Sequence, residues 1–347
     1  MMLPRYDENH KLVGFLKSKT ISLVNENQMA GTGVIVEFFD EDQTSGGRIS
    51  MQKVIFDKIN GMLSAREPVD IKSDKLTASG SGIYYSFEES KGFLIGPATT
   101  TIIAPSQTAM NSNSSKLRAT ALSLAVATQA INAAPPEATA QIDASNKEAR
   151  ADLTKDLDDS VAALNAAKSF LKQADASVTT SAPIPAPDKP LEVKTSDTET
   201  VIHCEGGMYF DAEEGVLVYL KNVTVKDPRF NLSGANEVKV FFGKKPPKGK
   251  SKTVDEKSEE PKLGGKIGAN FGDVEKIIAT GAVLLEQVAR EANREPIKAS
   301  GAIFTYRLKE DQVTISGGFP WVVQGATYLR AKQANLTLRL SPKSWNI

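Results

Sequence analysis

The sequence predicts an all-β fold in two halves, with a helical and proline-rich segment between them. Three observations support this prediction. A strand–turn–strand unit recurs in both halves, several strands are apolar on both faces, and the composition changes near residues 105 and 198. Recurrence of one supersecondary unit is typical of stacked architectures, so we expect the strands to stack in an open-ended β structure.

The recurring unit is a strand ending in aromatic residues, a polar turn and a second strand. Its four copies are 53–65 (KVIFDKINGMLSA), 82–96 (GIYYSFEESKGFLIG), about 208–220 (MYFDAEEGVLVYL) and 301–317 (GAIFTYRLKEDQVTISG). Gly61, Gly92 and Gly215 are expected to close the first three turns, where a residue with positive φ is often needed.

Some strands are apolar on both faces, for example 216–220 (VLVYL) and 238–242 (VKVFF). A strand with one face in water alternates apolar and polar residues. These strands are therefore covered on both sides or line an apolar space. An ordinary sandwich core and a folded sheet with an apolar groove both satisfy the pattern.

The composition predicts three regions: a β domain at 1–105, an Ala/Ser-rich linker at 106–197 and a second β domain at 198–347. Within the linker a helix is expected at about 146–174, because apolar residues recur there at helical spacing: Leu153, Leu157, Val161, Leu164 and Leu171. This helix is expected to pack on a domain or lie in the linker, and a coiled-coil partner helix is the alternative. A lysine-rich loop is predicted at 243–265.

Charge and residue usage argue against several functions. Lys+Arg and Asp+Glu each total 42, so no net basic charge is available to hold nucleic acid. The single cysteine, Cys204, and the neighbouring His203 point to opposite faces of a strand and cannot share a metal ion. No nucleophile, metal-binding or phosphate-binding motif is present. We therefore expect no catalytic residue, metal or cofactor.

Several stretches resemble the OstA-like domains of lipopolysaccharide transport proteins. In the second half these are GMYFDAEEGVLVYLKNVTVKDPRFNLSGANEVKVFF (207–242), FGDVEKIIATGAVLLEQV (271–288) and ASGAIFTYRLKEDQVTISGGFPWV (299–322). The first half is similar to the LptC version, with LPRYDENHKLVGFLKSKTI (3–21) and a run from 65 to 102. The resemblance covers about 1–105 and 198–340, and the second half is similar to the LptA type.

The resemblance implies a folded-over antiparallel β-jelly-roll, or β-taco, with an apolar groove along its length. It further implies a periplasmic protein that carries lipopolysaccharide or a similar lipid toward the outer membrane. Implied partners are other OstA-like proteins, joined by edge-strand stacking, and an ABC transporter at the inner membrane. The first residues contain no apolar segment that could serve as a signal or anchor, so such a segment is not visible in this chain.

Groove-lining candidates are aromatic and branched residues of the repeated units and the strands between them: Phe210, Val218, Val225, Phe230, Val283, Leu285, Phe304, Tyr306 and Ile315. A one-residue error in strand phase would move any of them to the opposite face. Two other hypotheses stay open. One is an assembly scaffold whose interior is filled by its own side chains, and the other is a carbohydrate-active enzyme on a β scaffold.

Overall fold

The computed structural model describes residues 1–6, 10–39, 45–103, 136–177, 199–244, 271–288, 295–310, 312–334 and 336–340. The chain forms two units, one of Met1–Ala104 with Ala162–Ile347 and one of Pro105–Val161. In the second unit, the described residues are the helical residues 136–161. Most of the expected linker and residues 245–265 of the expected lysine-rich loop lie outside the described residues.

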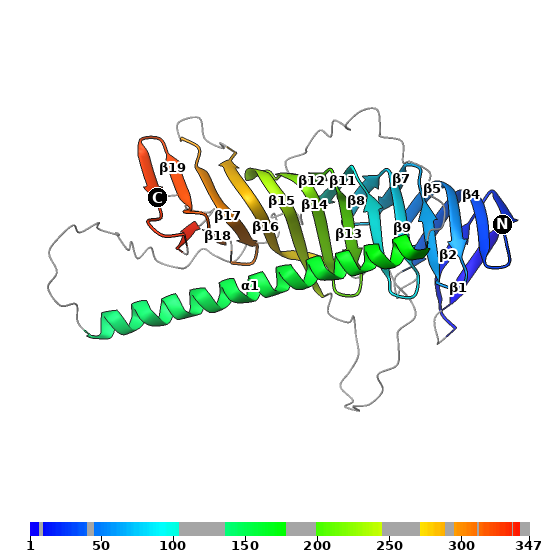
Figure 1. Cartoon of the computed structure of the whole chain (residues 1–347), viewed down its shortest axis with the longest axis horizontal. Helices are drawn as coiled ribbons and strands as arrows, with labels where there is room; N and C mark the ends of the chain where they lie inside the picture. The colour runs from blue at the N-terminus through cyan, green and yellow to red at the C-terminus, as the bar shows by residue number, and fades with distance from the viewer. Residues whose placement is uncertain are drawn as a thin grey trace, which may run out of the picture. The chain divides into compact units, whose positions relative to one another are not determined.

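The first unit is built on one antiparallel sheet. All strands that the structure describes belong to this 21-stranded sheet, and they follow one another largely in chain order (Figure 1). The sheet continues across the long linker, because β10 pairs with β13 and β11 pairs with β12. The all-β antiparallel fold predicted from the sequence is therefore confirmed.

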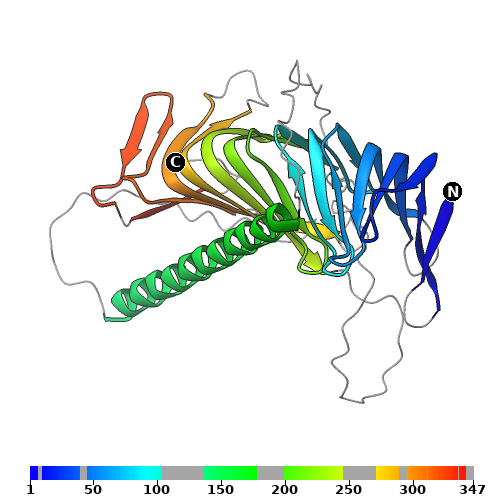
Figure 2. The same cartoon turned by 45° about the vertical axis from the view of Figure 1, so that its right-hand side comes forward.

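The sheet folds over into two facing layers, which we call leaf A and leaf B (Figure 2). Leaf A holds the short strands β1 (Met2–Tyr6), β2 (Leu12–Lys17), β7 (Val69–Lys72), β8 (Leu76–Gly80), β11 (Ala98–Ile103), β12 (Glu199–Cys204), β19 (Trp321–Gln324) and β20 (Thr327–Arg330). Leaf B holds β3 (Thr20–Leu23), β6 (Met62–Ala65), β9 (Gly82–Ser86), β10 (Lys91–Ile95), β13 (Gly207–Asp211), β18 (Gln312–Ser316) and β21 (Thr337–Leu340).

Long strands run through both leaves and bend between them. They are β4 (Gln28–Phe39), β5 (Ser45–Asp57), β14 (Val216–Lys226), β15 (Phe230–Lys244), β16 (Phe271–Gln287) and β17 (Lys298–Arg307). Along β4, β5, β14 and β17, one half pairs with a leaf A strand and the other half with a leaf B strand. For example, β14 pairs with β13 through Val216–Leu220 and with β12 through Thr224–Lys226. The strands β15 and β16 pair with their long neighbours instead.

Irregular backbone marks the crease where the long strands bend. Gly234 in β15 and Gly281 in β16 have φ of 73° and 135°, and the β15–β16 register shifts beside Gly234. A Cβ on Gly234 would lie 2.2 Å from the carbonyl oxygen of Ala282, so a larger residue does not fit. Such bulges bend a strand and increase its twist. Elsewhere the crease is a short connection, as at Ser81 between β8 and β9.

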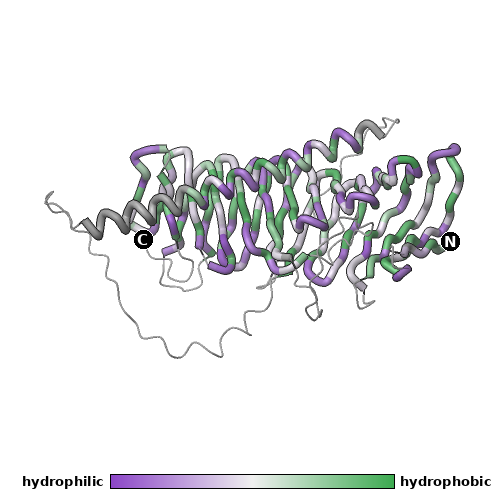
Figure 3. Tube along the Cα trace, turned by 90° about the horizontal axis from the view of Figure 1, so that it is seen from below, coloured by the Kyte–Doolittle hydropathy of each residue, from purple (hydrophilic) through white to green (hydrophobic). Residues whose placement is uncertain are grey.

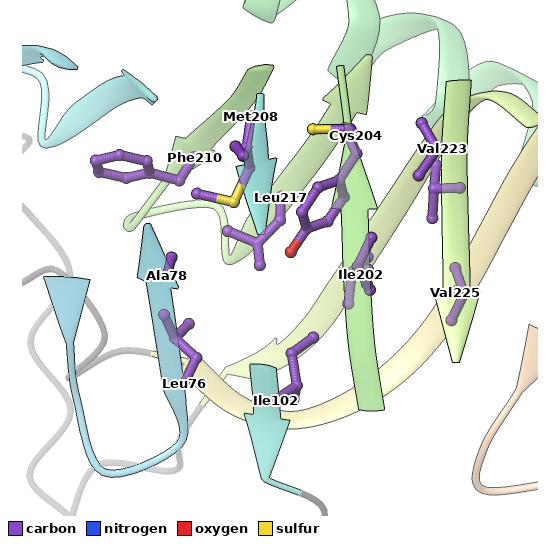
Figure 4. Packing of buried hydrophobic residues seen from close by; sticks show 14 of the residues in the cluster. Leu76, Ala78, Ile102, Ile202, Cys204, Met208, Phe210, Leu217, Val223 and Val225 are labelled. Atoms are coloured by element: carbon purple, nitrogen blue, oxygen red, sulfur yellow. The ribbon is translucent and has the colours of Figure 1, made fainter. Parts of the chain in front are cut away.

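The space between the leaves holds one continuous apolar cluster. Side chains from leaf A, such as Leu76 and Ile202, point into the same space as Met208, Phe210 and Leu217 from leaf B (Figure 4). Hydrophobic and hydrophilic residues alternate along many strands, as Figure 3 shows by colour. This alternation directs one face of each leaf toward the interior.

Helix α1 (Pro136–Ser177) explains why some strands are apolar on both faces. Its last part, from Ala162 onward, packs on the outer face of leaf B in a second cluster. The ring of Phe170 lies 5.8 Å from that of Tyr209 in β13, and Val216 and Val218 of β14 belong to the same cluster. The interior covers one face of β14 and the helix covers the other.

The helix buries a different stripe from the leucine stripe predicted from the sequence. Its buried residues from this packed part are Ala163, Ala167, Phe170 and Ala174. Leu164 and Leu171 are only half-buried, and Val161 is 54% exposed. Small alanine side chains allow the helix to lie close to the flat sheet, so the leucines flank the contact instead of forming it.

The four expected hairpins are present as β5–β6, β9–β10, β13–β14 and β17–β18. Gly61 and Gly215 have positive φ in their turns, as predicted. The expectation for Gly92 is wrong. Ser90 takes the positive φ (57°), and Gly92 lies in β10, where a Cβ would come within 2.2 Å of the Phe210 ring.

Candidate functional site

An apolar cavity of about 380 Å³ opens between the leaves at the N-terminal end of the sheet. Its wall includes Leu3, Leu16 and Val34 from leaf A, and Ile21, Met29, Val54, Phe56 and Leu63 from leaf B. Five of these residues are half-buried, because they lie in or near β1 and β3, the last strands at this end of the sheet: Leu3, Leu16, Ile21, Met29 and Phe56. The cavity therefore continues the interior cluster as an accessible cleft.

A few polar groups contribute to the cavity wall. Lys58 and Glu88 are exposed and come from the turns at the tip of leaf B. The Lys58 ammonium donates to the carbonyl oxygen of Glu26 at 3.1 Å. Ser18, at the crease, is buried and its hydroxyl donates to the carbonyl oxygens of Thr20 and Thr32. An apolar wall with a few polar groups is typical of a small-molecule site.

The nine groove candidates lie deep inside the fold, each at most 2% exposed. Eight of them belong to the interior cluster: Phe210, Val225, Phe230, Val283, Leu285, Phe304, Tyr306 and Ile315. The Phe230 ring lies 5.6 Å from Phe304 and 5.7 Å from Tyr306. At these positions the chain's own side chains fill the space between the leaves. Contact between these residues and a lipid stays a prediction.

Val218 lies on the opposite face from the other eight. It belongs to the cluster under helix α1, whereas its neighbours Leu217 and Tyr219 belong to the interior cluster. The sequence could not decide which face of β14 carries Val218. Both faces are apolar, so no alternation of polar and apolar residues distinguishes the inner face from the outer face.

A polar clasp joins the two leaves beside the filled part of the interior. Arg229 follows β14 at the tip of leaf A, and its Nε and Nη2 donate to the Asp227 carboxylate at 2.7 and 2.9 Å. The Arg229 guanidinium also lies 4.8 Å from the Tyr306 ring centroid on leaf B and donates to the Tyr306 hydroxyl. The side chain of Asp227 is 1% exposed and accepts a further bond from Thr200 at 2.7 Å.

A second link between the leaves is the ion pair of Lys75 and Asp273, 2.7 Å apart. Lys75 precedes β8 in leaf A, and Asp273 lies at the start of β16 in leaf B. Both side chains are partly in water, so this pair contributes less than the buried clasp. Together the two links hold the leaf tips near one another in the part of the sheet that follows the cavity.

Other groups with possible chemistry are isolated in the described part of the chain. Cys204 faces the interior and burial raises the pKa of its thiol, while His203 on the other face contacts the Thr99 hydroxyl through Nδ1 at 2.9 Å. Their opposite orientation was predicted from the sequence. Among the described residues no group of three His, Cys, Asp or Glu side chains is placed to hold a metal ion. None of the described helical residues forms a segment long and apolar enough to span a bilayer.

Sequence reasoning did not single out the cavity residues. Leu3, Leu16 and Ile21 lie in short strands and Met29 lies at the start of the long strand β4, all before the first recurring hairpin.

Comparison with known proteins gives limited information. No protein-family model matches this chain, and no curated protein matches its sequence. One similar solved structure is LptH from Pseudomonas aeruginosa, described as the LptA homologous periplasmic component of the lipopolysaccharide transport device. The identity is 16% and the TM-score is 0.30, with 42% of this chain and 78% of that chain covered. A likeness at this level assigns neither a family nor a function.

Proposed function

We propose that this chain is a non-enzymatic periplasmic protein that binds lipopolysaccharide or a similar amphiphile through its acyl chains. The open apolar cavity at the N-terminal end carries this proposal. Its volume of about 380 Å³ lies within the range of small-molecule pockets. The resemblance of the sequence to OstA-like domains supports the same conclusion.

The physical driving force is burial of methylene groups. Each contributes about 0.8 kcal/mol on transfer from water, so ten methylenes contribute about 8 kcal/mol. Lys58 at the cavity is placed to meet an anionic head group, while the acyl chain contacts Leu16, Ile21 and Phe56. Such binding requires no reacting group, which accords with a non-enzymatic role.

The proposed protein partners follow from the free edges of the sheet. Within the described residues β1 pairs only with β2, and β3 pairs only with β4. Unpaired strand edges accept further strands. We expect other OstA-like proteins to add here and continue the sheet beside the cavity. An ABC transporter at the inner membrane would supply the energy for lipid movement.

The test compares one substitution on the two faces of leaf B. Ile21→Glu places a carboxylate in the cavity wall, whereas Ile55→Glu places it on the outer face of β5, where Ile55 is 40% exposed. Burying a charge in an apolar site is costly, so Ile21→Glu should weaken binding of a fluorescent fatty-acid probe by at least about tenfold. Ile55→Glu should bind like the wild type, and lipopolysaccharide should displace the probe.

A second variant separates blocked binding from misfolding. Met29→Trp keeps the wall apolar but occupies cavity volume, so it should reduce probe binding without lowering the melting temperature. Absence of probe binding by the wild type, or equal binding by Ile21→Glu and Ile55→Glu, would refute the proposal.

An assembly scaffold is the alternative function, favoured by the filled interior around Phe230, Phe304 and Tyr306. A scaffold would bind only proteins. Native mass spectrometry of the purified chain distinguishes the two functions, because co-purifying lipid is expected only for a lipid carrier.

A further inference from the structure

The hairpin of β19 and β20 ends leaf A with an exposed apolar patch. We call this the C-terminal patch and define it as Phe319, Trp321, Tyr328, Leu329 and Leu336. Tyr328 is 57% exposed, Leu329 48%, and Phe319 and Leu336 44% each. Tyr328 and Leu329 lie in β20, Phe319 just before β19 and Leu336 just before β21. Isolated exposed apolar residues are normal on a protein surface, but four within residues 319–336 at one end of the sheet indicate a contact surface.

The patch exposes apolar residues on both faces of the hairpin. Tyr328 is paired with Val323, and its ring lies 6.3 Å from that of Trp321 on the outer face. Leu329 is paired with Val322 on the inner face. Within the described residues β20 pairs only with β19. A terminal hairpin that is apolar on both faces is stabilised when both faces leave water. The interfacial layer of a lipid membrane can cover both faces.

The charge in the sequence of the patch is positive. Residues 312–347 contain four basic residues, Arg330, Lys332, Arg339 and Lys343, and no Asp or Glu, although the whole chain is neutral. The Arg330 guanidinium lies 5.9 Å from the Phe319 ring centroid, so this cation belongs to the patch itself. One carboxylate adjoins the hairpin, because Glu295 lies beside Gly325 in the turn between β19 and β20. Glu286 in β16 is paired with Lys298 at 2.7 Å.

We propose that the C-terminal patch docks on an anionic lipid membrane surface. Tyr and Trp side chains are favourable at the level of the lipid head groups, because the apolar part of the ring contacts lipid while its polar group stays hydrated. Tyr328, Leu329 and Phe319 enter that layer. Arg330 and Lys332 contact lipid phosphates, and each basic residue near such a surface strengthens binding about fivefold.

A second copy of this chain fits the patch less well. In a head-to-tail contact the patch would meet the edge strands β1 and β3, which contain one basic residue, Arg5, and no acid. Within these two strands the cations of the patch would meet no opposite charge. An anionic membrane supplies that charge. This inference rests on the patch alone and does not depend on what the N-terminal cavity binds.

The test is co-flotation of the full chain with vesicles of phosphatidylcholine, alone or with 30% phosphatidylglycerol. Three double variants are compared with the wild type: Tyr328→Ser/Leu329→Ser, Arg330→Gln/Lys332→Gln, and the control Leu23→Ser/Ile59→Ser. Leu23 and Ile59 are 67% and 68% exposed at the other end of the sheet. Circular dichroism and melting temperature establish that each variant is folded.

The wild type should bind the anionic vesicles, and added salt should weaken that binding. Each patch variant should reduce partitioning about tenfold or more, and the control should bind like the wild type. Equal binding to neutral and anionic vesicles would overturn the proposal. The proposal would also be overturned if vesicle binding were lost only on removal of residues 341–347. The same holds if the patch variants altered self-association in sedimentation experiments but left vesicle binding unchanged.

Discussion

The two ends of the interior are built from the same folded sheet but differ in access. At the N-terminal end, Leu16, Ile21 and Met29 are half-buried around a cavity of about 380 Å³. In the C-terminal half, Phe230, Phe304 and Tyr306 are at most 1% exposed and their rings contact one another. The fold alone therefore does not decide whether the space between the leaves is open. Aromatic side chains fill it around Phe230, whereas the cavity lies beside the terminal strands β1 and β3.

Polar contacts reinforce this difference. In the filled half, Arg229 links the tip of leaf A to Tyr306 on leaf B and is held by the buried Asp227 carboxylate. At the cavity, Lys58 and Glu88 are exposed in turns of leaf B. Among the described residues, the N-terminal cleft is not closed by a buried ion pair, whereas the clasp links the leaves beside Tyr306.

The largest expected effect tests whether the C-terminal interior is filled. Phe304→Ala removes a fully buried ring from the centre of the cluster and should lower the free energy of unfolding by about 4 kcal/mol. Phe56→Ala, in the half-buried cavity wall, should cost less than half of that and weaken binding of a fatty-acid probe. Both are measured by urea denaturation. Equal losses in the free energy of unfolding for the two variants would mean that the two ends of the interior are packed equally well.

A second, smaller effect concerns the clasp. Arg229→Met leaves the Asp227 carboxylate buried with Thr200 but without its cation, which should cost about 3 kcal/mol. The control is Lys309→Met, which breaks the exposed pair with Glu275 and should cost less than about 1 kcal/mol. If loss of the clasp opens the C-terminal interior to lipid, Arg229→Met should also increase the amount of fluorescent fatty-acid probe bound per chain. An unchanged stability in Arg229→Met would show that the clasp does not hold the leaves.

The hairpins and the antiparallel fold were predictable because their signals are local. Polar turns flanked by aromatic and β-branched residues set the strands, and Gly61 and Gly215 marked two of the turns. The segment 216–220 predicted that this strand is covered on both faces or lines an apolar space. It could not show that helix α1 is one of the two covers, because that contact joins residues far apart in the sequence.

The location of the cavity was not predictable from the same pattern. The nine groove candidates are aromatic and branched apolar residues, and such residues also fill a protein interior. Whether facing residues such as Phe230 and Phe304 meet depends on how the leaves fold together at Gly234 and Gly281. The phase of Val218 was ambiguous for the reason that β14 has no polar face.

The smallest effect is a pH dependence in the closed half, at Lys239 of β15. Its side chain is 1% exposed and paired with Glu237, yet burial lowers its pKa below the ordinary value of 10.5. Between the lowered folded pKa and 10.5, the unfolded chain binds a proton that the folded chain lacks, so the free energy of unfolding rises with pH in that window. Below the folded pKa the full cost of burying the charged ammonium is present.

Lys239→Met removes this titration while Glu237 keeps a bond from the Thr280 hydroxyl at 3.3 Å. The variant should therefore gain stability relative to the wild type at neutral pH, and the gain should shrink as pH rises toward 10.5. Urea denaturation at a series of pH values measures this difference. A difference that stays constant with pH would mean that Lys239 keeps an ordinary pKa in the folded protein. In that case water reaches the Lys239 ammonium in the folded protein. The packing around Lys239 is then looser than its 1% exposure indicates.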